Sequence, residues 1–343
     1  MGKFRRSLGL FALVMLVGLL AFGASNVTQP AATISTGRGQ GVVDMVTGAN
    51  GTTVYALTAF LDNNSLKIVD TTTDKVVKTC PVGSMLDTTN IDVGSKGVFV
   101  ADHGADKISL LDLSECAEKG YKPTEWDVSA FCDGPYDVKS IGDKVYVTCS
   151  LSDNLAILDS SGKLADSIPL GHGPRNEGLF SSWGQRWLLI ANYYDWTASL
   201  INLSTNEVVK TLNTGPYPYD VITAADKFFG HVLCSVGDKD TIIDTASRKV
   251  WRTCGTYANP ISGVAGQGDL SGYIFIGAEF GNPASDTYGL EGTIQVATVF
   301  GPIVKNFQVG RNPTALALTP DGKLLVGYNE GNIDVYDVAK LLP

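Results

Sequence analysis

The sequence predicts an all-β fold, a seven-bladed β-propeller with four strands in each blade. Two short apolar strands with a polar break between them recur seven times, and successive copies start about 42 to 50 residues apart. The 343 residues include 38 glycines, and only 18% are charged, which suits a packed, turn-rich β protein. The repeat runs without interruption, so one closed array is expected rather than two or three domains.

The first strand of the repeated pair is the most regular element. Its seven copies are Val54–Thr58, Val98–Asp102, Val145–Cys149, Leu188–Asn192, Val232–Val236, Ile274–Ala278 and Leu324–Tyr328. The partner strands are Leu66–Asp70, Ile108–Asp112, Leu155–Asp159, Ala198–Asn202, Asp240–Asp244, Ile294–Thr298 and Ile333–Asp337. Turn-forming residues such as Pro320, Asp321 and Gly322 separate the strands of each unit.

Two further strands complete each predicted blade. Inner strands precede the repeated pair, most clearly at Tyr136–Ile141, Tyr219–Ala224 and Thr314–Thr319. Outer strands end the unit at Lys75–Cys80, Lys163–Pro169, Glu207–Leu212, Lys249–Cys254 and Ile303–Val309. The last unit lacks an outer strand, because only a short tail follows Asp337. Ala31–Gly37 resembles the outer strands, and pairing it with the last blade would close the ring and remove two free sheet edges.

The N-terminus has the pattern of a targeting segment. Lys3, Arg5 and Arg6 precede an apolar run from Leu8 to about Ala24, so residues 1–25 are predicted to be a signal peptide and residues 26–343 a single propeller domain. An uncleaved anchor is the alternative, since the run is slightly long for a signal peptide. The expected location is secreted or extracytoplasmic, in a periplasm or at a cell surface, with no membrane contact beyond this segment.

Six cysteines are compatible with an oxidising compartment. Cys132 precedes the inner strand of the third blade and Cys149 ends the strand antiparallel to it, so a disulfide between them is geometrically possible. Cys80 and Cys254 lie at matching places in distant blades, and their likeness is ascribed to the repeat. The net charge of −9 disfavours nucleic acid as a partner, because binding phosphates needs clustered Lys and Arg.

A family resemblance rests on two stretches of the repeat. Residues 309–326 (VGRNPTALALTPDGKLLV) and 206–216 (NEVVKTLNTGP) resemble the blade pattern of YVTN-type propellers, and the likeness extends over roughly residues 31 to 338. The resemblance implies an exported propeller of the surface-layer or lactonase-like kind. Similar folds carry lactonases, lyases and quinoproteins, so the resemblance indicates a fold more firmly than an activity.

One position of the inner strand carries Asp or Asn in five consecutive blades. The equivalent residues are Asp44, Asn90, Asp137, Asn176, Asp220, Ser262 and Ala315. Strand alternation directs them toward the mouth of the central channel, where Asp137, Asn176 and Asp220 are candidate ligands for Ca²⁺ or Mg²⁺. The alternative is structural, because Asx side chains also fasten the turn that enters each strand. No cofactor is certain.

The same rim is expected to gather titratable and aromatic side chains. His103, His172 and Glu177 are candidates for acid–base catalysis, although histidines beside turn glycines are often merely solvated. The candidate ligand-binding residues are Arg175, Tyr193, Asp195, Trp196, Tyr217 and Tyr219. The alternative for these aromatic residues is packing between blades.

Several chemistries have no motif in this chain. It contains no haem-attachment motif, no phosphate-binding loop and no nucleophile elbow, and its five tryptophans do not recur in register. Two hypotheses remain. The first is an exported propeller that binds a protein, a cell-surface component or a small ligand through its loop rim. The alternative is a divalent-cation-dependent enzyme of the lactonase or lyase type that uses rim carboxylates and His172 or Glu177.

Overall fold

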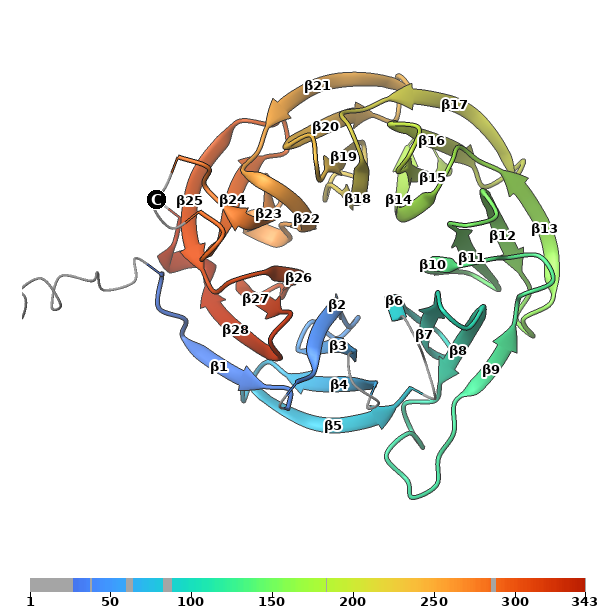
Figure 1. Cartoon of the computed structure of the whole chain (residues 1–343), viewed down its shortest axis with the longest axis horizontal. Helices are drawn as coiled ribbons and strands as arrows, with labels where there is room; N and C mark the ends of the chain where they lie inside the picture. Colours follow the sequence, from blue (N-terminus) through green and yellow to red (C-terminus); the bar gives the residue numbers. More distant parts are fainter. Residues whose placement is uncertain are drawn as a thin grey trace, which may run out of the picture.

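A computed structural model describes residues 27–37, 39–59, 64–82, 88–182, 184–284 and 288–342. In this part of the chain the strands form seven four-stranded antiparallel sheets arranged as blades around a central axis (Figure 1). The predicted fold class is therefore confirmed. The predicted signal peptide, residues 1–25, lies outside the described residues.

The first four blades follow the predicted spacing closely. Blade 1 contains β2 (Gly41–Thr47), β3 (Thr53–Ala59), β4 (Ser65–Asp70) and β5 (Lys75–Pro81). Blade 2 contains β6 (Thr88–Gly94), β7 (Gly97–Asp102), β8 (Lys107–Leu111) and β9 (Thr124–Asp127). Blade 3 contains β10 (Pro135–Ile141), β11 (Lys144–Cys149), β12 (Asn154–Leu158) and β13 (Leu164–Pro169). Blade 4 contains β14 (Pro174–Ser182), β15 (Gln185–Asn192), β16 (Thr197–Asn202) and β17 (Glu207–Asn213).

The last three blades include two short 3₁₀ helices. Blade 5 contains β18 (Pro218–Thr223), β19 (Phe229–Cys234), β20 (Lys239–Asp244) and β21 (Lys249–Gly255). Blade 6 contains β22 (Ala258–Ala265), η1 (Gly268–Leu270), β23 (Tyr273–Gly281), β24 (Gly292–Thr298) and β25 (Ile303–Val309). Blade 7 contains β26 (Pro313–Leu318), β27 (Lys323–Tyr328) and β28 (Asn332–Asp337), and η2 (Val338–Lys340) follows.

The fourth strand of blade 7 comes from the other end of the chain. β1 (Ala32–Ser35) pairs antiparallel with β28, with Ile34 opposite Ile333 (Figure 1). Ile34 is 4% exposed and packs in a cluster of buried residues from blades 1 and 7. The hydroxyl of Thr36 donates to the carbonyl of Gly331, which extends this pairing beyond the strand. The first and last segments therefore share one sheet.

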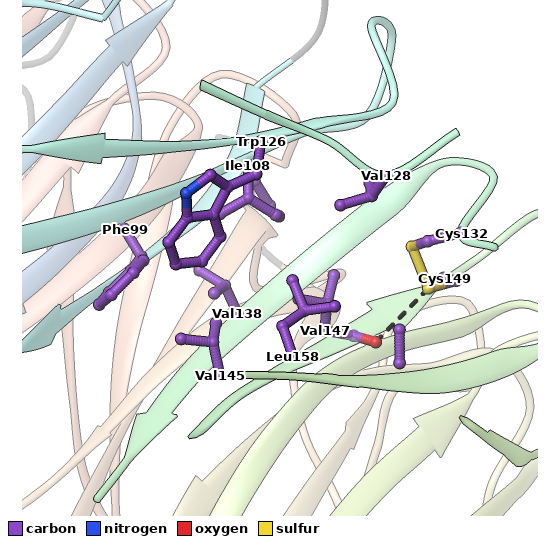
Figure 2. Packing of buried hydrophobic residues seen from close by; sticks show 12 residues of the cluster. Phe99, Ile108, Trp126, Val128, Cys132, Val138, Val145, Val147, Cys149 and Leu158 are labelled. Carbon is purple, nitrogen blue, oxygen red and sulfur yellow. Dashed lines mark hydrogen bonds between the residues drawn. A yellow bond between two sulfur atoms is a disulfide. The ribbon is translucent and has the colours of Figure 1, made fainter. Parts of the chain in front are cut away.

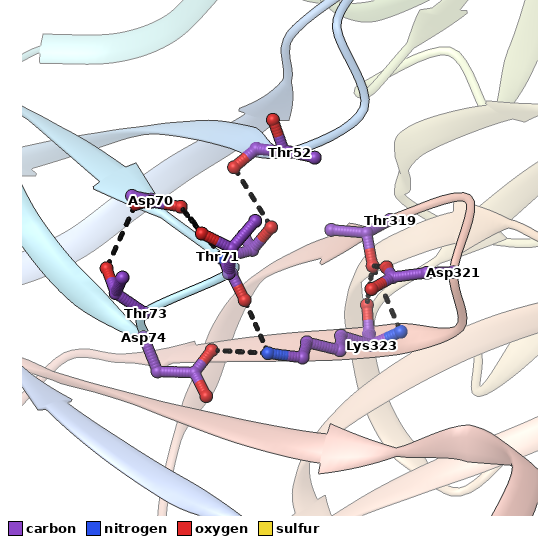
Figure 3. A network of polar contacts seen from close by, with 9 residues as sticks. Thr52, Asp70, Thr71, Thr73, Asp74, Thr319, Asp321 and Lys323 are labelled. Carbon is purple, nitrogen blue, oxygen red and sulfur yellow. Dashed lines mark hydrogen bonds and ion pairs between the residues drawn. The ribbon is translucent and has the colours of Figure 1, made fainter.

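A polar contact reinforces the same seam between blades 7 and 1. The Lys323 ammonium on β27 donates to the Thr71 carbonyl and lies 2.8 Å from the carboxylate of Asp74, both in the turn after β4 (Figure 3). The Thr71 hydroxyl donates in turn to the carbonyl of Thr52. Lys323 and Asp74 are both about three-quarters buried, so this ion pair is better shielded from solvent than an ordinary surface pair.

The hydrophobic core lies between neighbouring blades. In one cluster Phe99 and Trp126 of blade 2 pack against Val138, Val145 and Leu158 of blade 3 (Figure 2). The ring centroids of Phe99 and Trp126 are 5.6 Å apart. Each blade buries its two faces against its neighbours, so no blade has an apolar core of its own. This is the packing expected of a repeat whose units are unstable alone.

Two disulfides are present among the described residues. Cys132 and Cys149 are bonded as predicted, beside the start of β10 (Figure 2). Cys80 on β5 is bonded to Cys116 in the loop between β8 and β9, and this link between blades 1 and 2 was not predicted. Cys234 and Cys254 are free thiols. The two bonds indicate an oxidising, extracellular environment. In the described residues, no helix is long and apolar enough to cross a membrane.

Removing the side chain of Ile34 tests how much the closing strand contributes. Because Ile34 is buried against blades 1 and 7, Ile34→Ala is expected to lower the free energy of unfolding by about 2–5 kcal/mol. Denaturant unfolding followed by fluorescence measures the change. Thr33→Ala in the same strand removes only an exposed hydrogen bond to Asp334, so it is the matched control. Equal effects of the two substitutions would contradict a stabilising role for the buried face of β1.

Candidate functional site

A bulge near the start of every inner strand shapes the mouth of the central channel. Pairing registers shift between Val42 and Asp44, between Pro135 and Asp137, and between Pro218 and Asp220, and corresponding shifts occur in the other four inner strands. A bulge redirects the side chain that follows it, and such irregularities are common beside functional sites. This redirected position is the one that carries Asp or Asn in five blades. We call its seven residues the Asx ring, namely Asp44, Asn90, Asp137, Asn176, Asp220, Ser262 and Ala315.

The ring carboxylates bind backbone amides of their own strand and of the next blade. Asp44 accepts the N–H of Met45 at 2.7 Å with Oδ1 and the N–H of Ile91 in blade 2 at 2.9 Å with Oδ2. Asp137 likewise accepts the N–H of Val138 with Oδ1 and the N–H of Glu177 in blade 4 with Oδ2, both at 2.8 Å. This second bond ties blade 3 to blade 4. These carboxylates therefore fasten the entry to the inner strands, which is the structural alternative to cation binding.

The candidate cation ligands are accordingly engaged with protein groups. Asp220 Oδ1 accepts the N–H of Val221 at 2.8 Å and the amide Nδ2 of Asn176 at 3.0 Å. Asn176 Oδ1 is buried and has no hydrogen-bond partner among the described residues. No group of three or more His, Cys, Asp or Glu side chains suited to a metal ion occurs in the described ranges. The geometry of Asp137, Asn176 and Asp220 thus adds no support for a bound Ca²⁺ or Mg²⁺.

A cavity of about 340 Å³ opens at this mouth. Six of the seven ring positions line it, namely Asp44, Asn90, Asn176, Asp220, Ser262 and Ala315. Tyr136, Tyr219, Thr314 and Asn329 complete most of its polar surface. The volume lies within the range of small-molecule sites. All positions of the Asx ring except Asp137 therefore line one pocket.

Two carboxyl groups in this wall titrate near neutral pH. Burial raises the pKa of Asp44 to about 7, against the opposing effect of its hydrogen bond from Ile91. Burial likewise raises the pKa of Asp220 to about 6, against the bond from Asn176. Both groups exchange protons close to physiological pH, so the charge of the cavity depends on pH in that range.

Arg175 stacks among tyrosines beside the cavity. Its guanidinium carbon lies 3.9 Å from the ring centroid of Tyr193, 4.8 Å from that of Tyr136 and 4.9 Å from that of Tyr219. Arg175 Nη1 donates to the Tyr136 hydroxyl at 2.9 Å, and Tyr136 donates to the Tyr219 hydroxyl at 2.9 Å. We call Tyr136, Arg175, Tyr193 and Tyr219 the tyrosine–arginine cluster.

The hydroxyl of Tyr219 is the last group in this chain of hydrogen bonds and can donate to a ligand. Tyr219 accepts from Tyr136, so the hydroxyl hydrogen of Tyr219 is not used in that bond, and no other hydrogen bond involves it within the described ranges. Tyr219 lines the cavity. The positive charge of Arg175 polarises the chain in one direction, which strengthens the terminal donor.

The remaining rim aromatics extend from the cluster toward solvent. Tyr194 and Trp196 are 54% and 47% exposed. The Tyr193 ring lies 5.0 Å from that of Tyr194, and the Trp196 ring lies 5.7 Å from that of Tyr217. Trp196 and Tyr217 have φ angles of 57° and 55°, a left-handed conformation that is unusual for aromatic residues and occurs often at functional sites.

The three candidate catalytic residues do not converge. The exposed His172 ring pairs with Asp153 at 2.9 Å, and its backbone N–H donates to Asp195 Oδ2 at 2.8 Å. His103 Nε2 lies 3.0 Å from the Ser150 hydroxyl. Glu177 is 4% exposed and faces the interior. The structure therefore brings Arg175, Tyr193, Tyr217 and Tyr219 together but gives His172 and Glu177 different environments.

Glu177 has an unusual position for a carboxyl group. Both of its oxygens are buried without a hydrogen-bond partner among the described residues. Burial raises its pKa well above the usual range, and Asp137 adds to this effect while Lys139 opposes it. The corresponding residues of five other blades are apolar, namely Met45, Ile91, Val138, Val221 and Leu316. Burial lowers the pKa of Lys139, but the surrounding carboxylates outweigh burial and raise it.

Tyr136 is the main site residue that the sequence analysis missed. Tyr136, Arg175 and Tyr219 occupy the same register position in blades 3, 4 and 5, one residue before the Asx ring. The tripeptide Pro-Tyr-Asp occurs both at residues 135–137 and at residues 218–220. Aligning the repeat at this neighbouring position would have identified the cluster.

The pH dependence of stability tests the titration of Asp44. The folded state binds a proton at Asp44 that the unfolded chain has lost above about pH 4, so this group stabilises the fold at low pH and loses that effect as pH rises toward 7. Its contribution to the slope of unfolding free energy is about −1.4 kcal/mol per pH unit. Asp44→Asn should make the slope less negative, as measured by denaturant unfolding between about pH 5 and 7. Asp143→Asn in an exposed turn is the control, and an unchanged slope in the Asp44 variant would contradict the assignment.

Replacing Glu177 tests whether its burial is costly. Glu177→Met removes an unpartnered buried carboxyl from a position that is apolar in other blades, so the free energy of unfolding should rise by about 1–3 kcal/mol. Denaturant unfolding measures this. Glu207→Met on the exposed strand β17 controls for the general effect of the substitution. A less stable Glu177 variant would show that the carboxyl makes a net favourable interaction.

Comparison with known proteins shows the fold alone. No protein-family model matches the chain, and no curated protein matches its sequence. The structure is similar to a Kuenenia stuttgartiensis hydrazine synthase chain, with a TM-score of 0.70 and 17% identity over 90% of this chain and 99% of that one. It is also similar to streptogramin B lyase, with a TM-score of 0.66 and 16% identity over 88% of this chain and 94% of that one. The resemblance to propellers is confirmed as a fold, without a match to the YVTN family.

Proposed function

We propose that this chain is an exported binding protein whose cavity at the channel mouth holds a small polyhydroxylated ligand of the saccharide type. The observation that carries the proposal is a wall rich in acceptors combined with one polarised donor. Asp44, Asp220 and the unpartnered Asn176 Oδ1 are acceptors, and Tyr219 supplies the donor. A ligand with several hydroxyl groups offers both donors and acceptors to this set.

The surroundings of the cavity favour the same class of ligand. The exposed rings of Tyr194 and Trp196 extend the site at the rim, and large amphipathic rings of this kind are enriched in binding surfaces. The acceptors are also held rigidly. Asp44 accepts backbone N–H groups of its own strand and of blade 2, and Asp220 accepts a backbone N–H of its own strand and the side-chain amide of Asn176. Preorganised groups lower the entropy cost of binding.

An extracytoplasmic location is part of the proposal. Two disulfides form between cysteines of the mature domain, and such bonds persist outside the reducing cytosol. The basic and apolar pattern of residues 1–25 supports export by a signal peptide. A soluble saccharide or the terminal unit of a cell-surface glycan would then meet the open rim.

A lyase-type or lactonase-type enzyme is the second candidate. It is favoured by Asp44 and Asp220, whose pKa values of about 7 and 6 suit proton transfer at neutral pH. His172 and Glu177, by contrast, share no hydrogen bond, because both Glu177 oxygens are without a partner among the described residues and the His172 ring pairs with Asp153. Metal analysis of the purified mature protein tests the cation-dependent form of this hypothesis. Stoichiometric Ca²⁺ or Mg²⁺ that is lost on Asp137→Ala and Asp220→Ala would favour the enzyme.

Deleting the Tyr219 hydroxyl tests the binding proposal. Calorimetric titration of the mature protein with a panel of neutral monosaccharides and disaccharides should identify a binder. Tyr219→Phe should weaken its Kd about 5- to 20-fold, because the acceptor atom of the ligand loses its partner while the ring is retained.

Tyr257→Phe is the matched control for this experiment. It removes a hydroxyl that accepts an exposed hydrogen bond from Asn306, away from the cavity, and should leave the Kd unchanged. Absence of binding to every saccharide of the panel would overturn the proposed ligand class. An unchanged Kd in Tyr219→Phe, or equal weakening by both substitutions, would contradict a specific contribution of the Tyr219 hydroxyl.

A further inference from the structure

Exposed aromatic side chains gather on blades 5 and 6, far from the cavity. Phe228, Trp251 and Phe300 are 39%, 57% and 52% exposed. The Phe229 ring joins them, with its centroid 5.9 Å from that of Trp251 and 5.6 Å from that of Phe300. Val304 beside them is also exposed. These five residues lie at one end of blades 5 and 6, and the ring contacts of Phe229 with Trp251 and Phe300 join the aromatic side chains into one apolar surface.

The strand register places this surface at the opposite end of the blade from the cavity. Pro218 begins β18 at the cavity mouth, and Thr223 at its other end pairs with Gly230. Phe229 precedes Gly230 and begins β19, so it lies at the end of the blade away from the mouth. Trp251 belongs to β21, the outermost strand of the same blade (Figure 1). Six of the seven residues of that strand are exposed.

Unpaired cations flank the aromatic surface. They are Lys227, Arg248, Lys249 and Arg252, and none of them forms an ion pair with a carboxylate in the described part of the chain. The guanidinium carbon of Arg248 lies 4.9 Å from the centre of the Trp187 ring. The neighbouring Asp226 and Asp244 accept backbone N–H groups instead, from Phe228 at 2.8 Å and from Ala246 at 2.9 Å. Four cations against these two carboxylates leave a local excess of positive charge in a chain whose net charge is −9. We call the five apolar residues and the four cations the aromatic–basic patch.

We infer that the aromatic–basic patch docks this protein on an anionic lipid surface. Tryptophan and phenylalanine rings settle at the level of lipid headgroups, and nearby Lys and Arg side chains are attracted to anionic lipids. From the sequence we predicted no membrane contact beyond the N-terminal segment, but this side-chain arrangement argues for one. The inference does not depend on the ligand proposed for the cavity.

Charge complementarity favours lipid over a second copy of this chain. A twofold dimer through the patch would place each set of four cations against its equal, because an isologous contact uses the same surface twice. An anionic membrane has the opposite sign. Docking through the patch would also leave the cavity mouth facing away from the membrane, open to solutes.

Vesicle sedimentation of the mature protein tests the inference. The protein should sediment with vesicles of phosphatidylcholine and phosphatidylglycerol but not with phosphatidylcholine alone, and raised salt should weaken the binding. Arg248→Glu combined with Lys249→Glu, and separately Trp251→Ser combined with Phe300→Ser, should each reduce binding about tenfold or more. All four side chains are exposed, so the fold should be retained.

A control pair lies on another part of the molecule. Lys119→Glu combined with Lys122→Glu makes the same charge change in the exposed loop between β8 and β9 and should leave vesicle binding unchanged. Failure of the unmodified protein to bind the anionic vesicles would overturn the inference, as would equal loss in the control. A dimer that depends on Trp251 and Phe300, detected by light scattering, would assign the patch to self-association instead.

Discussion

The rest of the molecule depends on a carboxylate of one inner strand that accepts a backbone N–H of the next blade. Asp44 accepts the N–H of Ile91, and Asp92 accepts the N–H of Ser140 at 2.7 Å. Asp137 accepts the N–H of Glu177, at the bulge of β14. Because these contacts join inner strands of neighbouring blades, they help to set the spacing of the blades beside the channel. They also fix the ring that forms the cavity wall. Asp44 combines both roles, because it ties blade 1 to blade 2 and also lines the cavity.

The architecture was accessible from the sequence because each blade repeats a local pattern of apolar strands and turn residues. The position of the Asx ring followed from the same periodicity, since every bulge falls at the same place in its strand. Contacts across blades were not accessible in this way. The stacking of Arg175 on Tyr136, Tyr193 and Tyr219 joins three blades, and no spacing along the chain specifies which rings meet.

Residues that are close in the sequence also do not always lie in the same environment. His172 and Glu177 are five residues apart, yet the intervening bulge and strand alternation direct one to solvent and the other between blades. The Cys80–Cys116 bond escaped prediction for a related reason, since it joins an outer strand to a loop that the repeat does not specify. The Cys132–Cys149 bond was predictable because both cysteines flank one pair of adjacent strands.

The pairing of β1 with β28 has a consequence for how the chain folds. The Thr33 hydroxyl on β1 donates a hydrogen bond to the carboxylate of Asp334 on β28, 301 residues away in the sequence. Loop-closure entropy and the high proportion of non-local contacts make such a pairing slow to form. β1 is the first of the described strands to be synthesised, but its partner β28 is the last of them. The seventh sheet is therefore completed last, and a chain cut short before β28 has no complete seventh sheet and two open edges.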